Sequence, residues 1–337
     1  MDYPIIISSE ANVYYYSGLN SSNALLILYN NEKIIITDSR YEEAAGKTGL
    51  NVAVTKGGND IVEVALEILS GLGCEKIGYE DYNMLAKDYL RFAQSYKMIP
   101  VSKEFLKVRA KKDENEVTKM LTASKIASLA FDKAFEEAKE GITETALAAL
   151  IDFQIRASGC QGNSFDTIVA FGKNASMPHH EPDNTVLKSG DCVLIDLGAK
   201  FAGYCSDMTR MFYMGQPSSI DKEIYEITLE AQERAISAIR DGAFCKNIDS
   251  IARDYIKEKG YGKCFGHGTG HGVGLEIHEF PTLNQASLDV LETGMVVTVE
   301  PGIYLPGQTG VRIEDMLLVT RDGCINLTST DKKMKIK

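Results

Sequence analysis

Residues 193–213 read VLIDLGAKFAGYCSDMTRMFY, two apolar runs joined by a turn-like stretch. Each run carries an acid, Asp196 in the first and Asp207 in the second. A hairpin centred between Phe201 and Ala202 places these two acids opposite each other. Opposed residues of an antiparallel pair hold their Cβ atoms about 5 Å apart, so the hairpin would direct two carboxylates to one point. Because bare negative charges repel at that distance, the pair favours a bound divalent cation.

A second stretch, residues 296–319 (VVTVEPGIYLPGQTGVRIEDMLLV), has the same design. Glu300 and Glu314 flank the turn residues Pro306–Gly307, so a second hairpin would oppose these two acids. Two such hairpins, together with His271 from the chain between them, suit a pair of metal ions.

The chain repeats itself from about residue 113 onward. The pattern L-x-x-G-x-x-V-x-x-[DE] ends at Asp196 and occurs again 104 residues later, ending at Glu300. Upstream, glycines bracket a helical run at 141–159 and another, 101 residues later, at 242–260. The repeat predicts two copies of a unit made of two helices and a strand hairpin. Hairpins that face each other across a pseudo-two-fold axis would bring their acids together on that axis.

Composition narrows the class of protein. The 337 residues suffice for two domains, and 44% hydrophobic with 25% charged residues is typical of a globular protein. A net charge of −11 argues against nucleic acid and against anionic membranes as partners. Seven scattered cysteines without a C-x-x-C motif predict reduced thiols and a cytoplasmic location. We also expect no signal peptide and no membrane span.

Two domains are predicted within an α/β (α+β) fold class. Residues 1–110 alternate strand-like and helical runs, which predicts a sheet covered by helices. The short basic segment Lys107–Asp113 predicts a linker. Asp113 and Glu116 form a capping box that would start the long first helix of the second domain, 111–337.

Residues 266–274 have glycine at every second position, with His267, Thr269 and His271 between the glycines. A dinucleotide-binding loop is the alternative, but no strand-then-helix context frames this stretch. Glycine at period two favours an extended segment whose bare face is approached closely by another backbone. His267 and His271 would share the other face, whereas His278 needs a bulge or bend to join them.

Together these motifs resemble the pita-bread metallopeptidases over roughly residues 110–330. Asp207 lies eleven positions after Asp196. Three motifs then occur in order: GHGVGLEIHE at 270–279, VEPG at 299–302 and RIED at 312–315. The family includes methionine aminopeptidase, aminopeptidase P and prolidase. The preceding domain resembles the creatinase-like amino-terminal domain of the last two. The resemblance therefore implies a creatinase-like α/β domain, then a pita-bread catalytic domain with a pseudo-two-fold internal repeat, and favours Xaa-Pro cleavage.

The resemblance also implies a role for each matching residue. The implied metal ligands are Asp196, Asp207, His271, Glu300 and Glu314. Asp207 and Glu314 would bridge two metal ions. Glu300 would also carry a proton from the attacking water to the leaving nitrogen. His278 would donate a hydrogen bond to the tetrahedral oxygen.

Three further residues complete the expected catalytic set. His179, rather than the adjacent His180, would bind substrate near the scissile bond. Arg312 would orient a ligating carboxylate, with a surface ion pair as the alternative. His267 is the last candidate, with a purely structural role as its alternative.

The resemblance favours an Xaa-Pro aminopeptidase that acts on longer peptides, with an Xaa-Pro dipeptidase (prolidase) as the close alternative. A metal-free hydrolase like creatinase and a non-catalytic binding protein of the same fold are remote alternatives, because all five ligands are present. An oxygen-rich site with one histidine favours manganese, with cobalt and zinc as alternatives. The expected partners are peptides with proline at the second position and, from the resemblance, a second copy of the chain in a homodimer.

Overall fold

The computed structural model describes residues 2–337 and divides the chain into two compact units, Met1–Val108 and Arg109–Lys337. Each unit has its own hydrophobic cores. Among the helices of the described residues, none is long and apolar enough to cross a membrane. Both units combine helices with β-sheets, so the predicted α/β class is confirmed.

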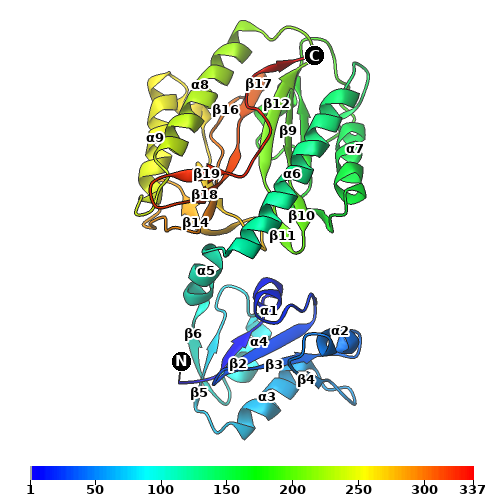
Figure 1. Ribbon diagram of the computed structural model, residues 1–337, viewed down its shortest axis with the longest axis vertical. Helices are drawn as coiled ribbons and strands as arrows, with labels where there is room; N and C mark the ends of the chain where they lie inside the picture. The colour runs from blue at the N-terminus through cyan, green and yellow to red at the C-terminus, as the bar shows by residue number, and fades with distance from the viewer. Residues whose placement is uncertain (1) are drawn as a thin grey trace. The chain divides into compact units, whose positions relative to one another are not determined.

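The first unit is built on a six-stranded sheet in the order β4-β3-β2-β1-β5-β6 (Figure 1). Its strands are β1 (Ile5–Ile7), β2 (Ala24–Tyr29), β3 (Glu32–Thr37), β4 (Asn51–Val54), β5 (Lys76–Tyr79) and β6 (Lys97–Pro100). The helices are α1 (Glu10–Ser17), α2 (Glu42–Gly46), α3 (Ile61–Gly71), α4 (Ala86–Phe92) and, after β6, α5 (Ser102–Ala110). Ile5 and Ile7 join one core and Ile6 joins another, because successive side chains of a strand point to opposite faces.

The segment Lys107–Asp113, predicted as a linker, contains the boundary between the two units, and two of its cations are buried. Helix α5 continues through Ala110, and the side chains of Arg109 and Lys112 are buried in ion pairs with Glu279. The Lys112 Nζ lies 3.2 Å from the Glu279 carboxylate. Buried charges persist only when they are paired, so these cations belong to an internal network of the second unit.

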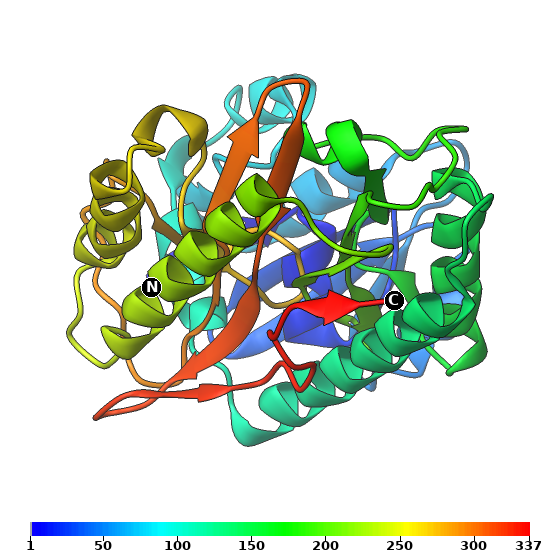
Figure 2. The same ribbon diagram turned by 90° about the horizontal axis from the view of Figure 1, so that it is seen from above.

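The second unit contains two copies of a motif with two helices and a hairpin, and the two helix pairs lie on opposite sides of the sheets (Figures 1 and 2). The first copy comprises α6 (Glu114–Glu137), α7 (Glu144–Ala157), β8 (Ile168–Phe171), β9 (Cys192–Leu197), β10 (Ala199–Phe201), β11 (Tyr204–Cys205) and β12 (Met208–Tyr213). The second comprises α8 (Ser219–Ser237), α9 (Cys245–Glu258), β13 (Gly270–Gly272), β14 (Glu279–Leu283), β15 (Val296–Val299), β16 (Gly302–Leu305), β17 (Thr309–Arg312) and β18 (Asp315–Val319). The shorter elements are β7 (Gly162–Asn163), η1 (Gly172–Ser176), η2 (Gly262–Cys264), β19 (Cys324–Asn326) and β20 (Lys335–Ile336).

Backbone hydrogen bonds repeat in the two copies. The N–H of Gly141 donates to the carbonyl of Leu187 at 3.0 Å, and the N–H of Gly242 donates to the carbonyl of Leu291 at 2.8 Å. The helices that follow these glycines, α7 and α9, are both 14 residues long. The internal repeat predicted from the sequence is therefore confirmed.

The register of the first hairpin differs from the prediction. Asp196 pairs with Thr209 and not with Asp207. The turn is centred between Ala202 and Gly203, one residue later than expected, and both have positive φ, 47° and 85°. Two such residues are typical of a two-residue hairpin turn. The prediction that the two acids lie directly opposite each other is therefore wrong. Asp207 is offset by two residues from the partner of Asp196, and this even offset keeps both acids on one face of the hairpin.

The register of the second hairpin is as predicted. Strand β15 pairs with β18, and β16 pairs with β17, in one continuous register on either side of Glu300 and Glu314. These two acids therefore lie at opposed positions. The turn comprises Pro306–Gln308 and is centred on Gly307, which has a φ of 70°.

Candidate metal centre

The five residues predicted to bind metal line one cavity of about 530 Å³ within the second unit. Ligand atoms of Asp207, His271 and Glu314 lie within 4.8 Å of one another. The Nε2 of His271 is 3.2 Å from the Glu300 carboxylate and 3.6 Å from the Asp207 carboxylate. Asp196 completes the lining set from the first hairpin. The repeat thus brings together residues that are up to about a third of the chain apart.

Arg312 joins the two hairpins at the edge of this acid cluster. Its Nη2 donates to Asp196 Oδ2 at 2.7 Å, and its Nε donates to the Thr209 hydroxyl at 3.0 Å. That hydroxyl in turn donates to Glu314 Oε2 at 2.8 Å. A guanidinium and a hydroxyl therefore fix one acid from each hairpin.

The acid cluster fits a metal ion. Within residues 2–337, the buried Oδ1 of Asp196 has no hydrogen-bond partner, and such an oxygen is costly unless something binds it. Burial, and then the negative charge of Glu314, raises the pKa of Asp207 well above its usual value. Burial and the charge of Glu300 do the same to the pKa of Glu314. A divalent cation would supply the missing partner and remove the repulsion.

His271 and Glu300 lie in direct contact and shift each other's pKa. Burial acts to raise the pKa of Glu300, but the hydrogen bond and charge of His271, together with the charges of His267 and Arg312, lower the pKa below its usual value. Burial acts to lower the pKa of His271, but the hydrogen bond and charge of Glu300, together with the Gly272 carbonyl and the charge of Asp196, raise the pKa above its usual value. A metal ion would take the place of the His271 proton, since a histidine ligand must be deprotonated at the coordinating nitrogen.

Strand β13 explains the alternating glycines. A Cβ atom on Gly270 or Gly272 would lie 2.0 or 2.3 Å from a carbonyl oxygen of a neighbouring segment, so only glycine fits at either position. The predicted close backbone approach is confirmed. The register then shifts after His271, and the ring centroids of His271 and His278 lie 4.4 Å apart. This irregularity is the bend that His278 needs in order to lie on the same side as His271.

His179, His267 and His278 line the same cavity as the acids. The Nε2 of His267 is 2.9 Å from the Tyr304 hydroxyl, to which Arg312 Nη1 also donates at 2.9 Å. Burial lowers the pKa of His267 and of His278, and the charge of neighbouring His271 lowers that of His278 further. Both imidazoles are therefore suited to hydrogen bonding as neutral groups.

In the described part of the chain, His180 lies outside the cavity lining. Its Nε2 is 2.7 Å from the carboxylate of Glu144, the first residue of α7. The same carboxylate accepts the backbone N–H groups of Phe171 and Asp183 at 2.7 and 3.1 Å. His180 thus fastens the loop that carries His179.

Sequence reasoning missed three hydroxyl groups that connect the site residues, those of Thr209, Thr298 and Tyr304. The Thr298 hydroxyl donates to Glu300 at 3.3 Å and accepts the backbone N–H of His271 at 3.1 Å. Each of the three lies two or four residues from an acid on its own hairpin. Because side chains of a strand alternate between faces, that even spacing was the available signal.

Two family models match the chain. Residues 118–321 match metallopeptidase family M24, and residues 4–111 match the creatinase/prolidase N-terminal domain. The chain belongs to metallopeptidase family M24. This M24 metallopeptidase is similar to the Xaa-Pro dipeptidase of Pyrococcus furiosus, with 38% identity over 339 residues that cover 98% of this chain and 94% of the relative.

Solved structures agree with this assignment. The Xaa-Pro dipeptidase from Bacillus anthracis has a TM-score of 0.95 and 38% identity, covering 99% of this chain and 95% of that one. The X-Pro aminopeptidase from Thermotoga maritima has a TM-score of 0.92 and 36% identity, covering 99% and 97% of the two chains. The pita-bread fold implied by the sequence resemblance is confirmed for this M24 metallopeptidase.

Proposed function

We propose that this M24 metallopeptidase is an Xaa-Pro dipeptidase (prolidase) that uses two divalent ions. The observation that carries the proposal is the single cavity lined by four acids of two hairpins, His271 and three further histidines. Relatives named as Xaa-Pro dipeptidases match nearly the whole chain, which favours the dipeptidase over the aminopeptidase that the resemblance placed first.

The five cavity residues Asp196, Asp207, His271, Glu300 and Glu314 would hold the ions. Four carboxylates and one imidazole form a hard donor set, which favours manganese, with cobalt or zinc as alternatives. Bound ions of this kind lower the pKa of a water molecule and stabilise negative charge on a scissile carbonyl oxygen.

Glu300 is the proposed proton carrier. Contacts of 3.2 Å with His271 and 3.3 Å with the Thr298 hydroxyl hold its carboxylate in place. It would accept a proton from the attacking water and deliver it to the proline nitrogen as the peptide bond breaks. The nitrogen leaves as an amine rather than as an amide anion, so the delivered proton is needed for the bond to break.

The histidines of the cavity would orient the substrate. His278 would donate a hydrogen bond to the carbonyl oxygen as negative charge develops on it. His179 would bind the peptide near the scissile bond. His267 is held against Tyr304 and would line the substrate side of the same cavity.

An Xaa-Pro aminopeptidase is the second candidate, and the charge of the cavity favours it. A dipeptide substrate carries a carboxylate on its proline, which a cation would have to receive. Among the described residues that line the cavity, Arg312 is the only lysine or arginine, and its donors already serve Asp196 and Tyr304. A longer peptide has no carboxylate at that position.

Hydrolysis of Ala-Pro and Ala-Pro-Ala, compared side by side, tests the proposal. The enzyme would be chelated and then reconstituted with manganese, with the chelated enzyme as the control. Cleavage of Ala-Pro alone supports the dipeptidase, whereas cleavage of Ala-Pro-Ala supports the aminopeptidase. A manganese-loaded enzyme that cleaves neither peptide would overturn Xaa-Pro specificity.

A homodimer and a cytoplasmic location stay predictions. Light scattering that gives the chain mass of 37.0 kDa in solution would contradict the dimer.

A further inference from the structure

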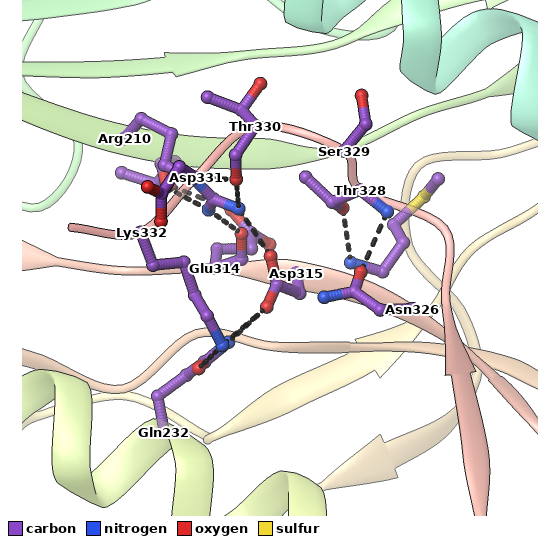
Figure 3. Close-up of polar contacts among 12 residues, drawn as sticks. Arg210, Gln232, Glu314, Asp315, Asn326, Thr328, Ser329, Thr330, Asp331 and Lys332 are labelled. Carbon is purple, nitrogen blue, oxygen red and sulfur yellow. Dashed lines mark hydrogen bonds and ion pairs between the residues drawn. The ribbon is translucent and has the colours of Figure 1, made fainter.

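A buried polar network adjoins the metal centre, and Arg210 of β12 is its hub (Figure 3). The Nη1 of Arg210 donates to the backbone carbonyls of Thr209, at 2.9 Å, and Glu314. Its Nη2 donates to Asp315 Oδ1 at 2.5 Å, and Nη2 and Nε donate to the Thr330 carbonyl at 2.8 and 3.1 Å. A guanidinium has five N–H groups, and these five hydrogen bonds employ them all. Arg210 therefore ties together the backbones of the two hairpins.

The network extends from Asp315 to a lysine that is remote in the sequence. The Oδ2 of Asp315 accepts from Gln232 Nε2 at 3.0 Å and lies 3.1 Å from Lys332 Nζ. Lys332 Nζ also donates to Gln232 Oε1 at 2.8 Å (Figure 3). Gln232 Nε2 lies 3.4 Å from the carbonyl of Val299, the residue before Glu300. Lys332 thus fixes the amide that contacts the backbone beside one cavity acid.

The charges of this network favour a fixed arrangement. Asp315 Oδ1 accepts from Arg210 and Asp315 Oδ2 lies beside Lys332, so its carboxylate has a cation at each oxygen. Asp315 is fully buried, and the side chain of Lys332 is 20% exposed. The loss of Lys332 would leave Asp315 Oδ2 without its cation, although Arg210 still pairs with Oδ1, and would disturb Asp315 and the backbone at Glu314.

We infer that Lys332 is a positioning residue of the metal centre, acting through Gln232 and Asp315 on the backbone at Glu300 and Glu314. The inference rests on the proposed function, since it concerns the same site. Within residues 2–337, Lys332 forms no hydrogen bond or ion pair with the five cavity residues proposed as ligands, and it lies 18 positions after Glu314, outside the motifs that mark them. Partners outside the first layer of ligands commonly set the geometry, and hence the affinity, of a metal site.

Manganese affinity of the chelated full-length protein, measured by isothermal titration calorimetry, tests the inference. Lys332→Met keeps the apolar stem and removes the charge and the donors. We expect its affinity for manganese to fall about 10-fold, with kcat reduced more than KM is changed. Lys332→Arg should recover most of the loss because it restores a cation. Lys333→Met, a change at the exposed neighbour, is the matched control and should bind like the wild type.

Three results would count against the inference. Equal manganese affinities for Lys332→Met and Lys333→Met would overturn it and leave the proposed function intact, as would a loss that Lys332→Arg does not reduce. If Lys332→Met does not fold, Lys332→Gln is measured in its place. A wild-type affinity of Lys332→Gln for manganese would likewise overturn the inference. A wild-type protein that binds no divalent ion would overturn the proposed function itself and the inference with it.

Discussion

The two hairpins of the second unit occupy equivalent places in the repeat but carry different side chains there. Aligned by their registers, four positions of the first hairpin correspond to four of the second: Asp196, Gly198, Asp207 and Thr209 to Glu300, Gly302, Arg312 and Glu314. An acid occupies the first position in both hairpins, and glycine occupies the second. The other two positions hold an acid in one hairpin only.

This difference links the hairpins to each other. Arg312, the counterpart of Asp207, donates to Asp196 and to Thr209. Thr209, the counterpart of Glu314, donates to Glu314. The repeat therefore sets the backbone, while the unequal side chains form hydrogen bonds across the axis that two identical hairpins could not form. Because the donor sets are unequal, we expect the two metal positions to differ in affinity.

The largest loss of activity is expected from a substitution of Glu300, at the position where both hairpins carry an acid. Glu300→Gln removes a ligand charge and the proposed proton carrier, so kcat on an Xaa-Pro peptide should fall by roughly 1000-fold or more at saturating manganese. His271→Ala removes a ligand and a contact to Glu300 but keeps the proton carrier, so it should lose most activity, with folding kept, yet lose less than Glu300→Gln. The control is Glu226→Gln on the exposed face of α8. A Glu300→Gln enzyme within about 10-fold of the wild type would contradict the role of this acid.

A smaller effect, a loss of manganese affinity, is expected from a substitution of Thr209, at a position where the two hairpins carry different side chains. Thr209→Val keeps the shape of the side chain but removes the hydroxyl between Arg312 and Glu314. Manganese affinity measured by calorimetry should fall by about 10- to 100-fold, because the carboxylate loses its orienting partner. Thr118→Val, at an exposed position of α6, is the control. If both variants bind like the wild type, the cross-hairpin hydrogen bonds have no part in holding the metal.

Proton binding to one acid of each hairpin gives a pH-dependent prediction. Burial and neighbouring carboxylates raise the pKa of Asp207 and of Glu314. The folded metal-free protein therefore holds these protons more tightly than the unfolded chain does. Their contribution to stability is complete below the unfolded pKa values of about 4 and is lost as the pH rises through the folded values.

A bound metal removes this loss, because it replaces the protons. The rise in melting temperature caused by manganese should consequently be larger at about pH 7.5 than at about pH 5.5. Differential scanning calorimetry with and without chelator measures the rise directly. A rise that shrinks toward neutral pH would mean that protons and metal do not compete at this pair.

The contrast between the hairpins also shows how far the sequence could predict the site. The second register was predictable because Pro306–Gly307 marks its turn without ambiguity. In the first hairpin Ala202 occupies a left-handed position that alanine seldom adopts, so the turn was placed one residue too early. The even spacing of side chains still put Asp196 and Asp207 on one face, and the acids converge for that reason.

Other features depend on contacts that no local pattern records. Arg109 and Lys112 lie in the basic segment predicted as a linker, and their partner, Glu279, lies more than 160 positions away, so the sequence did not show that they are buried. Lys332 looks like any lysine near other lysines until Gln232 and Asp315 are seen around it. A charge pattern gives the same signal whether the charges are solvated or buried in pairs, so only the folded chain distinguishes the two.

The smallest effect, a change in stability alone, is expected at the turn of the first hairpin, where the observed register differs from the predicted one. Ala202 has a φ of 47°, which costs an L-residue with an ordinary side chain about 1 kcal/mol. Asparagine tolerates this region better, so Ala202→Asn should raise the free energy of unfolding by less than about 1 kcal/mol and leave activity unchanged.

Gly203→Ala is the matched opposite change, because the φ of Gly203 is 85° and alanine there should lower stability by about 1–2 kcal/mol. Urea unfolding of the two variants beside the wild type measures both shifts. If neither variant changes stability, the turn is not centred on these two residues. The first hairpin would then return to the register that opposes Asp196 and Asp207, and the two hairpins would hold their acids in the same way.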